Sequence, residues 1–271
     1  MELPPMLPHH AQTVQNIKAH FEADPRVLAL ILGGSITHGF ALPGSDVDVM
    51  IVLSPEDHAA QLATGYATYR NVEAATYPDG YVDGKWTTLD FIRQVADHGS
   101  EPARYAFKSA RILFSHIPEL PSLLAAAGTY PLALKKERLQ SFRTQFAAWH
   151  WFSTEARKKD NVFLVNLAIG KMCLFGIRLI LAWNERLYPF HKWALKELEK
   201  AEEKPEGVIE AINRVSVDGS EENVEELFEL VKGYREWEEG MKADGWDRWG
   251  TVFLKDVELT WLNGQMSVED V

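Results

Sequence analysis

The stretch GGSITHGFALPGSDVDVMIV, residues 33–52, decides the expected fold of this chain. It begins with two glycines directly after the apolar run of residues 27–32, and it ends in the apolar, β-branched run of residues 47–53. A short apolar run closed by glycines is typical of a strand followed by a tight turn. A run that is apolar at nearly every position is typical of a strand covered on both faces. The stretch therefore predicts a strand, a glycine turn and a second strand.

The glycine turn has the composition of a phosphate-binding loop, because small residues let backbone N–H groups approach phosphate oxygens closely. Two familiar patterns do not fit. A P-loop needs Lys and then Ser or Thr directly after its second glycine, whereas Phe40 and Ala41 follow Gly39. The dinucleotide-binding fingerprint needs three glycines at a fixed spacing, which Gly33, Gly34 and Gly39 do not have. The aspartates after the turn must therefore be considered together with it.

Asp46 and Asp48 stand two residues apart at the start of the second predicted strand. Side chains at this spacing point to one face of a strand, with attachment points roughly 6 to 7 Å apart. Two like charges side by side at an apolar strand are costly unless a cation compensates them. Oxygen ligands suit Mg²⁺ or Mn²⁺, and two such ions about 3.5 to 4 Å apart can clamp the oxygens of a phosphoryl transfer. The pair therefore predicts a site for divalent metal.

A third carboxylate would complete such a site, and Asp90 in TTLDFI is the expected one. Residues 86–92 read as a third strand, on which Thr88 and Asp90 share a polar face. In that position Asp90 would act as a metal ligand and as the general base for an acceptor hydroxyl. Asp83 is the alternative, but YVDGKW places it in a turn signal.

The order of these residues resembles a known family. Gly34-Ser35, ten intervening residues, Asp46-Val47-Asp48 and then Asp90 in a later strand look like the nucleotidyltransferase superfamily typified by DNA polymerase beta. Smaller members include aminoglycoside and lincosamide nucleotidyltransferases and minimal nucleotidyltransferases of toxin-antitoxin systems. The resemblance implies a short mixed sheet with helices and two Mg²⁺ ions, for which Mn²⁺ can substitute. It assigns nucleotide binding to Gly34, Ser35 and Ser45, and metal binding and catalysis to Asp46, Asp48 and Asp90.

The second half of the chain carries a weaker resemblance. AWNERLYPFHKWALKEL, residues 182–198, looks like part of a helical domain that closes over the nucleotide in bacterial relatives, where a lysine reaches the triphosphate. That lysine would be Lys192, although a surface lysine is an equally good interpretation. Lys171 and Asn166 are further expected nucleotide contacts. A helix edge exposed to water and a helix asparagine bonded to its neighbour are their alternatives.

Composition and charge limit the possible partners. The chain has 271 residues, of which 46% are hydrophobic and 25% charged, as in an ordinary folded protein. The formal net charge of −11 disfavours nucleic acids and anionic membranes and favours a small, even cationic, acceptor. The opening MELPPMLPHH lacks the basic start and apolar run of a signal peptide, and there is a single cysteine. A cytoplasmic location is therefore predicted.

The periodicity of the chain predicts two domains. An α/β (α+β) nucleotidyltransferase domain with a short mixed sheet is expected over residues 1–125, and an all-helical domain over residues 126–271. Helical spacing covers residues 11–21 and, in the second half, residues 137–158, 161–185, 192–202 and 224–241. Residues 162–183 are apolar enough to suggest a membrane span, but two basic residues on one face favour a buried helix.

These observations predict an enzyme that transfers a nucleoside monophosphate from an NTP, with ATP preferred, to a hydroxyl of a small molecule and releases pyrophosphate. An aminoglycoside- or lincosamide-like antibiotic is one such acceptor, which would connect the chain with antibiotic resistance. Two other functions remain open. The first is AMP transfer to a protein, as in toxin-antitoxin systems. The second is nucleotide sensing without turnover.

Overall fold

A computed structural model describes residues 5–238 of the chain. It divides into two compact units, Met1–Thr129 and Tyr130–Val271, the second of which is described as far as residue 238. The last helix of the first unit, Leu120–Ala127, crosses the boundary expected after residue 125 and lies wholly in the first unit. The end of the helix expected over residues 224–241 falls partly outside the described residues.

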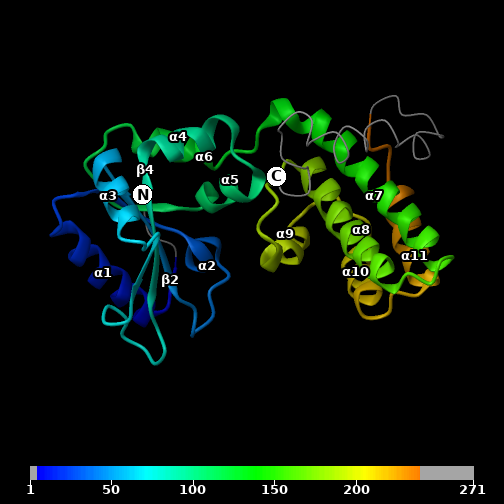
Figure 1. Cartoon of the computed structure of the whole chain (residues 1–271), viewed down its shortest axis with the longest axis horizontal. Helices are drawn as coiled ribbons and strands as arrows, with labels where there is room; N and C mark the ends of the chain where they lie inside the picture. The colour runs from blue at the N-terminus through cyan, green and yellow to red at the C-terminus, as the bar shows by residue number, and fades with distance from the viewer. Residues whose placement is uncertain (1–4, 239–271) are drawn as a thin grey trace. The chain divides into compact units, whose positions relative to one another are not determined.

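The N-terminal unit is a five-stranded mixed sheet with helices (Figure 1). In chain order its elements are α1 (Pro8–Glu22), β1 (Val27–Leu32), α2 (Gly34–His38), β2 (Val47–Leu53), α3 (Pro55–Ala63), β3 (Thr68–Asn71), β4 (Val82–Thr88), α4 (Leu89–His98), α5 (Glu101–Lys108), β5 (Arg111–Ser115) and α6 (Leu120–Ala127). The strand order is β3-β4-β2-β1-β5. β2 and β4 run parallel, and the other neighbouring strands are antiparallel. The expected α/β fold with a short mixed sheet is confirmed.

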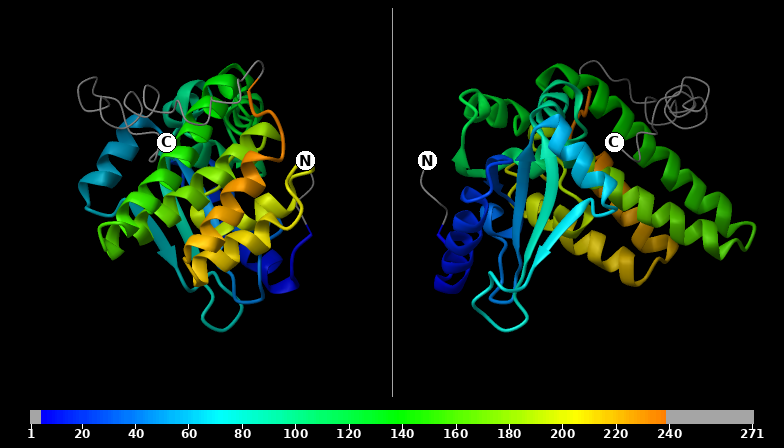
Figure 2. Two further views of the ribbon diagram at one scale, coloured as in Figure 1. Left: turned by 90° about the vertical axis from the view of Figure 1, so that its right-hand side faces the viewer. Right: turned by 60° about the vertical axis from the view of Figure 1, so that its left-hand side comes forward.

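The sheet separates two apolar clusters. On one face, α1 packs with alternate residues of β1 and β2, including Val47, Val49 and Ile51 (Figure 2). On the other face, α4, α5 and α6 pack with the remaining alternate residues, such as Ala29 and Val52. Both central strands are thus buried on both sides over most of their length, which explains their nearly continuous apolar sequences. Only the beginning of β2 carries polar side chains.

The third strand differs from the expectation. β4 covers Val82–Thr88, and α4 begins at Leu89 rather than after residue 92. Thr88 caps this helix, since its Oγ1 accepts a hydrogen bond from the N–H of Phe91 at 3.2 Å. Leu89, Ile92 and Val95 follow at helical spacing and pack beneath the sheet. The segment TTLDFI is therefore a strand end and a helix start.

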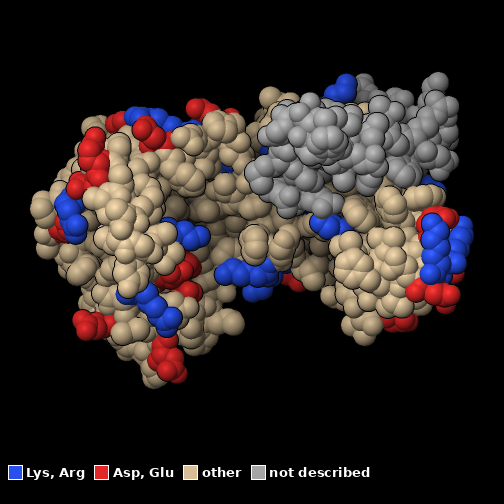
Figure 3. All heavy atoms as spheres, in the orientation of Figure 1, with Lys and Arg blue, Asp and Glu red and all other residues tan. Residues whose placement is uncertain are grey.

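Charges of both signs lie interspersed on the face of the N-terminal unit that Figure 3 draws. Despite the formal net charge of −11, the surface of this unit is therefore not uniformly negative. Because salt screens charges beyond about 8 Å, the residues next to a site matter more for a bound ligand than the total does.

The C-terminal unit is helical, as expected. Its elements are η1 (Leu132–Leu134), α7 (Lys135–Arg157), α8 (Val162–Trp183), η2 (His191–Trp193), α9 (Ala194–Glu199), α10 (Val208–Val217) and α11 (Glu221–Lys232). The helix α10 was not predicted, because its ten residues lie between two segments that contain Pro205 and Gly219. The helix α11 starts earlier than expected and ends at Lys232.

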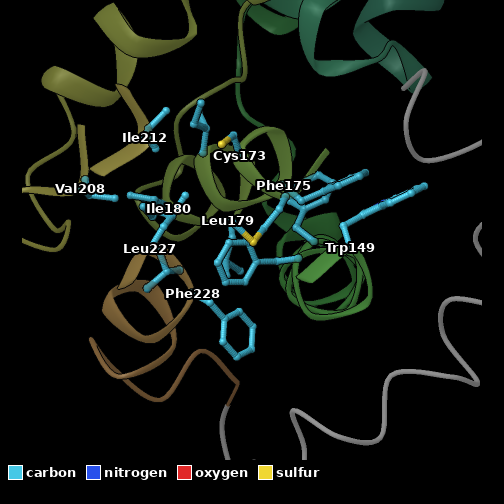
Figure 4. Packing of buried hydrophobic residues seen from close by; sticks show 14 of the residues in the cluster. Trp149, Cys173, Phe175, Leu179, Ile180, Val208, Ile212, Leu227 and Phe228 are labelled. Carbon is cyan, nitrogen blue, oxygen red and sulfur yellow. The ribbon is translucent and has the colours of Figure 1, made fainter. Parts of the chain in front are cut away.

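One helix, α8, is long and apolar enough to cross a membrane by length and composition alone, but 61% of its apolar window is buried within the structure. It packs along α7, and Figure 4 shows Phe175, Leu179 and Ile180 of α8 among side chains of α7, α10 and α11. This burial agrees with the expected central helix of the unit.

Candidate active site

Three carboxylates converge where β2 and β4 begin. Asp46 directly precedes β2, Asp48 is its second residue, and Asp83 is the second residue of β4. In the parallel pairing of the two strands Asp48 is opposite Asp83, so their side chains share a face. One oxygen from each of the three carboxylates lies within 4.8 Å of the others. All three residues are partly exposed, so the cluster is open to solvent and ligands.

The structure does not place Asp90 in this cluster, so the expected position of Asp90 is wrong. Asp90 lies in the first turn of α4, beyond the far end of β4 from Asp83. The five strand steps from Asp83 to Thr88 alone span roughly 17 Å. The Asp90 carboxylate is 63% exposed and pairs with Arg93, with an Oδ1 to Nη1 distance of 2.7 Å. Asp83, the alternative, is the residue that lies with Asp46 and Asp48.

The glycine turn is built against one of the three carboxylates. The N–H of Gly33 donates to the carbonyl oxygen of Asp48 at 2.9 Å. Gly34 has φ +66°, which disfavours other residues, and a Cβ placed on it would lie 1.7 Å from Oδ2 of Asp48. The side chain of Asp48 thus occupies the space that any larger residue at position 34 would need. The turn and the carboxylate cluster form one site.

Ser35 follows in this turn and has a buried hydroxyl. The residue is 8% exposed, and its Oγ has no hydrogen-bond partner among the described residues. A buried hydroxyl without a partner is costly, and a bound anion would remove that cost. The hydroxyl therefore fits the predicted phosphate contact, which stays a prediction.

Ser45, also expected at the nucleotide, shapes the backbone before Asp46. Its Oγ accepts a hydrogen bond from the N–H of Leu42 at 2.8 Å. Its carbonyl oxygen is 3.0 Å from Nε2 of His10 and accepts a hydrogen bond from the hydroxyl of Tyr77 at 2.6 Å. These contacts hold the segment that carries Asp46. His10 and Tyr77 were not predicted, because neither lies near residue 45 in sequence.

A second tyrosine reaches the cluster directly. The negative charge of Asp46 is the main cause that raises the pKa of the Tyr81 phenol. Burial, followed by the charge of Asp46, raises the pKa of Tyr77. Both phenols therefore remain protonated donors at neutral pH. The guanidinium of Arg70 lies over the Tyr81 ring, 4.2 Å from its centroid.

Two of the expected nucleotide contacts of the C-terminal unit lie on different sides of one helix. Asn166 is exposed on α8, and Lys171 is half-buried five residues further along, about 140° around the helix. Lys192 is exposed in η2, with Nζ 4.5 Å from the centroid of the Trp193 ring. The assignment of these three residues to the nucleotide stays a prediction.

The donor set of the cluster fits a divalent metal. Three carboxylate oxygens this close repel one another unless a cation lies between them. Oxygen-only ligands are those that Mg²⁺ and Mn²⁺ prefer, and a partly exposed site leaves room for water and phosphate ligands. Asp46, Asp48 and Asp83 are the residues that would hold such ions.

Comparison with known families agrees with this geometry. Residues 14–98, from α1 to the end of α4, match the family described as nucleotidyltransferase domain. This match agrees with the resemblance and supports a transferase.

Among solved structures, the chain is similar to a nucleotidyltransferase-like protein from Exiguobacterium sibiricum 255-15. The identity is 10% and the TM-score 0.47, over 94% of this chain and 87% of that chain. No curated protein sequence matches the chain.

Proposed function

We propose that the chain transfers AMP from ATP to a hydroxyl of a small molecule and releases pyrophosphate. The observation that carries this proposal is the placement of Asp46, Asp48 and Asp83 against the glycine turn. A metal-binding cluster beside a phosphate-binding turn is what a phosphoryl transfer requires, because such a reaction depends chiefly on positioning and charge stabilisation.

The residues of the turn are suited to the leaving group. Backbone N–H groups around Gly34 and the hydroxyl of Ser35 would hold the β- and γ-phosphates, which places the α-phosphate over the carboxylates. The missing side chain of Gly34 lets the phosphate chain and Asp48 approach each other closely. Divalent ions held by the three aspartates would neutralise charge on the phosphates as pyrophosphate leaves.

Asp83 is the proposed general base, in place of Asp90. It lies on β4, on the opposite side of β2 from β1 and the glycine turn. In an in-line displacement the attacking oxygen enters opposite the leaving pyrophosphate. A carboxylate on the β4 side is therefore placed to accept the proton of the attacking hydroxyl.

The proposed roles of Lys192, Lys171 and Asn166 are secondary. A basic or amide side chain from the helical unit would add contacts to the triphosphate or the nucleoside. Support for this comes from residue type and exposure alone. ATP is proposed as the donor and Mg²⁺ as the metal.

The proposal can be tested by label transfer. Purified chain is incubated with Mg²⁺, each of four α-labelled NTPs and a panel of hydroxylated antibiotics and metabolites. We expect label on an acceptor, with ATP as the best donor, and loss of transfer on chelation with EDTA and on Asp46→Asn or Asp48→Asn. Asp24→Asn is the matched control, since Asp24 pairs with Arg26 just before β1, which begins opposite the end of β2 that lies away from Asp48.

Two results would overturn the proposal. One is transfer at the wild-type rate by both Asp46→Asn and Asp48→Asn. The other is label found on a co-expressed protein, identified by mass spectrometry, with none on small molecules; this would establish protein modification instead.

A further inference from the structure

The open part of the sheet next to Asp83 carries two cations. Arg70 on β3 is opposite Asp83 in the antiparallel pairing of β3 with β4, so the two side chains share a face. Lys85 stands two residues after Asp83 on β4 and points to the same face. Asp48, opposite Asp83 on the other side, completes the row. The row therefore runs from Arg70 on β3 through Asp83 on β4 to Asp48 on β2, and Lys85 lies beside it on β4.

Both cations are available to a ligand. Arg70 and Lys85 are exposed, and within the described part of the chain neither lies within 4.0 Å of a carboxylate oxygen. The guanidinium of Arg70 lies 4.2 Å from the centroid of the Tyr81 ring, and Arg70 is paired with Asp83 across the two strands. The Tyr81 ring thus orients Arg70 beside the carboxylate cluster, and the N–H groups of Arg70 remain available to an anion.

The position of these cations separates them from the triphosphate. The strand order β3-β4-β2-β1 places the glycine turn, at the end of β1, on one side of the carboxylates. Arg70 and Lys85 lie on the other side, on β3 and β4. If the pyrophosphate leaves over the glycine turn, the acceptor enters over β4 and β3, because attack and departure are in line.

We propose that the acceptor carries an anionic group, a phosphate or a carboxylate, next to the hydroxyl that attacks. Arg70 and Lys85 bind this group, while Asp83 accepts the hydroxyl proton. The acceptor oxygen forms a bond to the α-phosphorus, and the bond from the α-phosphorus to the pyrophosphate oxygen breaks with its electron pair. The inference rests on the proposed function and names the acceptor class of the same site.

Local charge here opposes the overall charge of the chain. A net charge of −11 favours a cationic acceptor, such as an aminoglycoside, at long range. At physiological ionic strength charges beyond about 8 Å are largely screened, so the residues in contact with the acceptor decide its binding. The alternative role for Arg70 and Lys85 is to offset the charge of the three aspartates. In that role their loss would weaken nucleotide binding without changing the preference for anionic acceptors.

A binding experiment separates these two roles. The chain is saturated with Mg²⁺ and α,β-methylene-ATP, which fills the triphosphate site, and is then titrated with glycerol, glycerol 3-phosphate or glycerate. We expect glycerol 3-phosphate or glycerate to bind at least about tenfold more tightly than glycerol, since hydrogen bonds to charged groups contribute that much. The two anions distinguish a phosphate site from a carboxylate site.

The variant Arg70→Gln/Lys85→Gln should lose this preference for anions. Lys18→Gln/Arg26→Gln is the matched control, because it removes two cations that pair with other residues of the same unit. Arg70→Lys/Lys85→Arg keeps both charges and should retain the preference for anions. It keeps the proposal testable even if Arg70→Gln/Lys85→Gln folds poorly. Binding of α,β-methylene-ATP should change by less than about threefold in all of these variants.

The possible failures are distinguishable. Wild-type chain that binds glycerol as tightly as both anions, or anion binding that survives in Arg70→Gln/Lys85→Gln, would overturn the anionic acceptor and leave the transferase proposal standing. Weaker nucleotide binding in Arg70→Gln/Lys85→Gln, without loss of anion preference, would assign the cations to charge compensation. If α,β-methylene-ATP does not bind with Mg²⁺, the proposed function and this inference both fail. Binding of a short oligonucleotide, without binding of glycerol 3-phosphate or glycerate, would also overturn the anionic small-molecule acceptor.

Discussion

The two units of the molecule place their polar groups in different ways. In the N-terminal unit the polar residues of the site gather where strands begin, and Asp48 and Asp83 are side by side although 35 positions separate them in the sequence. In the C-terminal unit helices surround one apolar cluster, and a polar residue such as Arg178 is 2% exposed between aromatic rings of Phe142 and Tyr188. The carboxylates of the first unit lie at an open end of the sheet, whereas Arg178 of the second unit is enclosed.

This difference shows why the functional residues of one unit are easier to assign. Strand register fixes which side chains are neighbours, so three carboxylates can be identified as one group. Residues on a single helix diverge unless they are three, four or seven apart, and Asn166 and Lys171 are five apart. We therefore expect activity to depend more strongly on residues of the sheet than on residues of the helical unit.

The largest effect is expected at the third carboxylate. Asp83→Asn should lower the transfer rate by about 10²- to 10⁴-fold, because it removes both the proposed base and a metal ligand. Asp90→Asn should stay within about twofold of wild type, since Asp90 pairs with Arg93 on the surface. Steady-state rates of both variants with the same acceptor measure the difference. Equal losses of transfer rate in Asp83→Asn and Asp90→Asn would contradict the assignment of Asp83 as the third carboxylate.

A large effect is also expected at the glycine turn. Gly34→Ala should lower the transfer rate by about 10²-fold, because the new Cβ displaces the carboxylate of Asp48. Gly39→Ala is the control, since Gly39 also has positive φ but has no atom within 4 Å of the added Cβ. Both should lose about 1 to 2 kcal/mol of unfolding free energy from the backbone alone. Urea denaturation together with activity separates backbone strain from displacement, and full activity in Gly34→Ala would contradict the account.

A smaller effect is expected at Ser35. Ser35→Ala should raise the KM for ATP by about tenfold, the usual loss for a hydrogen bond to a charged group. It should leave the thermal midpoint unchanged or slightly higher, because the hydroxyl has no partner among the described residues. A fall in stability with an unchanged KM would show that the hydroxyl has a structural role.

The smallest effect is expected in the helical unit. Lys192→Ala should raise the KM for ATP about two- to fivefold, the range for an exposed and screened charge contact. Lys196→Ala, an exposed lysine in the next helix, is the matched control. A rise as large as that of Ser35→Ala would mean that both units contribute equally to the nucleotide. Equal KM values for Lys192→Ala and wild type would remove Lys192 from the site.

Much of the fold follows from local patterns in the sequence. The strands at residues 27–32 and 47–53 are found as predicted, because apolar runs bounded by glycine or Ser54-Pro55 leave little choice. The long helices α7 and α8 also follow from their spacing. The short helix α10 and the strand β3 were missed, since neither has a long apolar pattern.

The error at the third carboxylate has a physical cause. Asp83 lies between Tyr81 and Gly84 in a segment that has the residues of a turn, yet pairing with β2 on one side and β3 on the other makes it a strand. Asp90 lies in a segment with apolar residues at positions that suit either a strand or a helix. The Thr88 cap was the signal for a helix, and it is visible only if TTLDFI is interpreted as a helix start.

The close approach of Gly34 to Asp48 also restricts how the sequence of this site can change. A residue with a Cβ at position 34 needs the room that the carboxylate fills, and a longer acid at position 48 would extend toward a backbone that has no further space to yield. Neither substitution compensates for the other, because each adds atoms to the same small volume. Among homologous chains that keep the chemistry, we therefore expect positions 34 and 48 to stay fixed as a pair, and to be lost together in those that give it up.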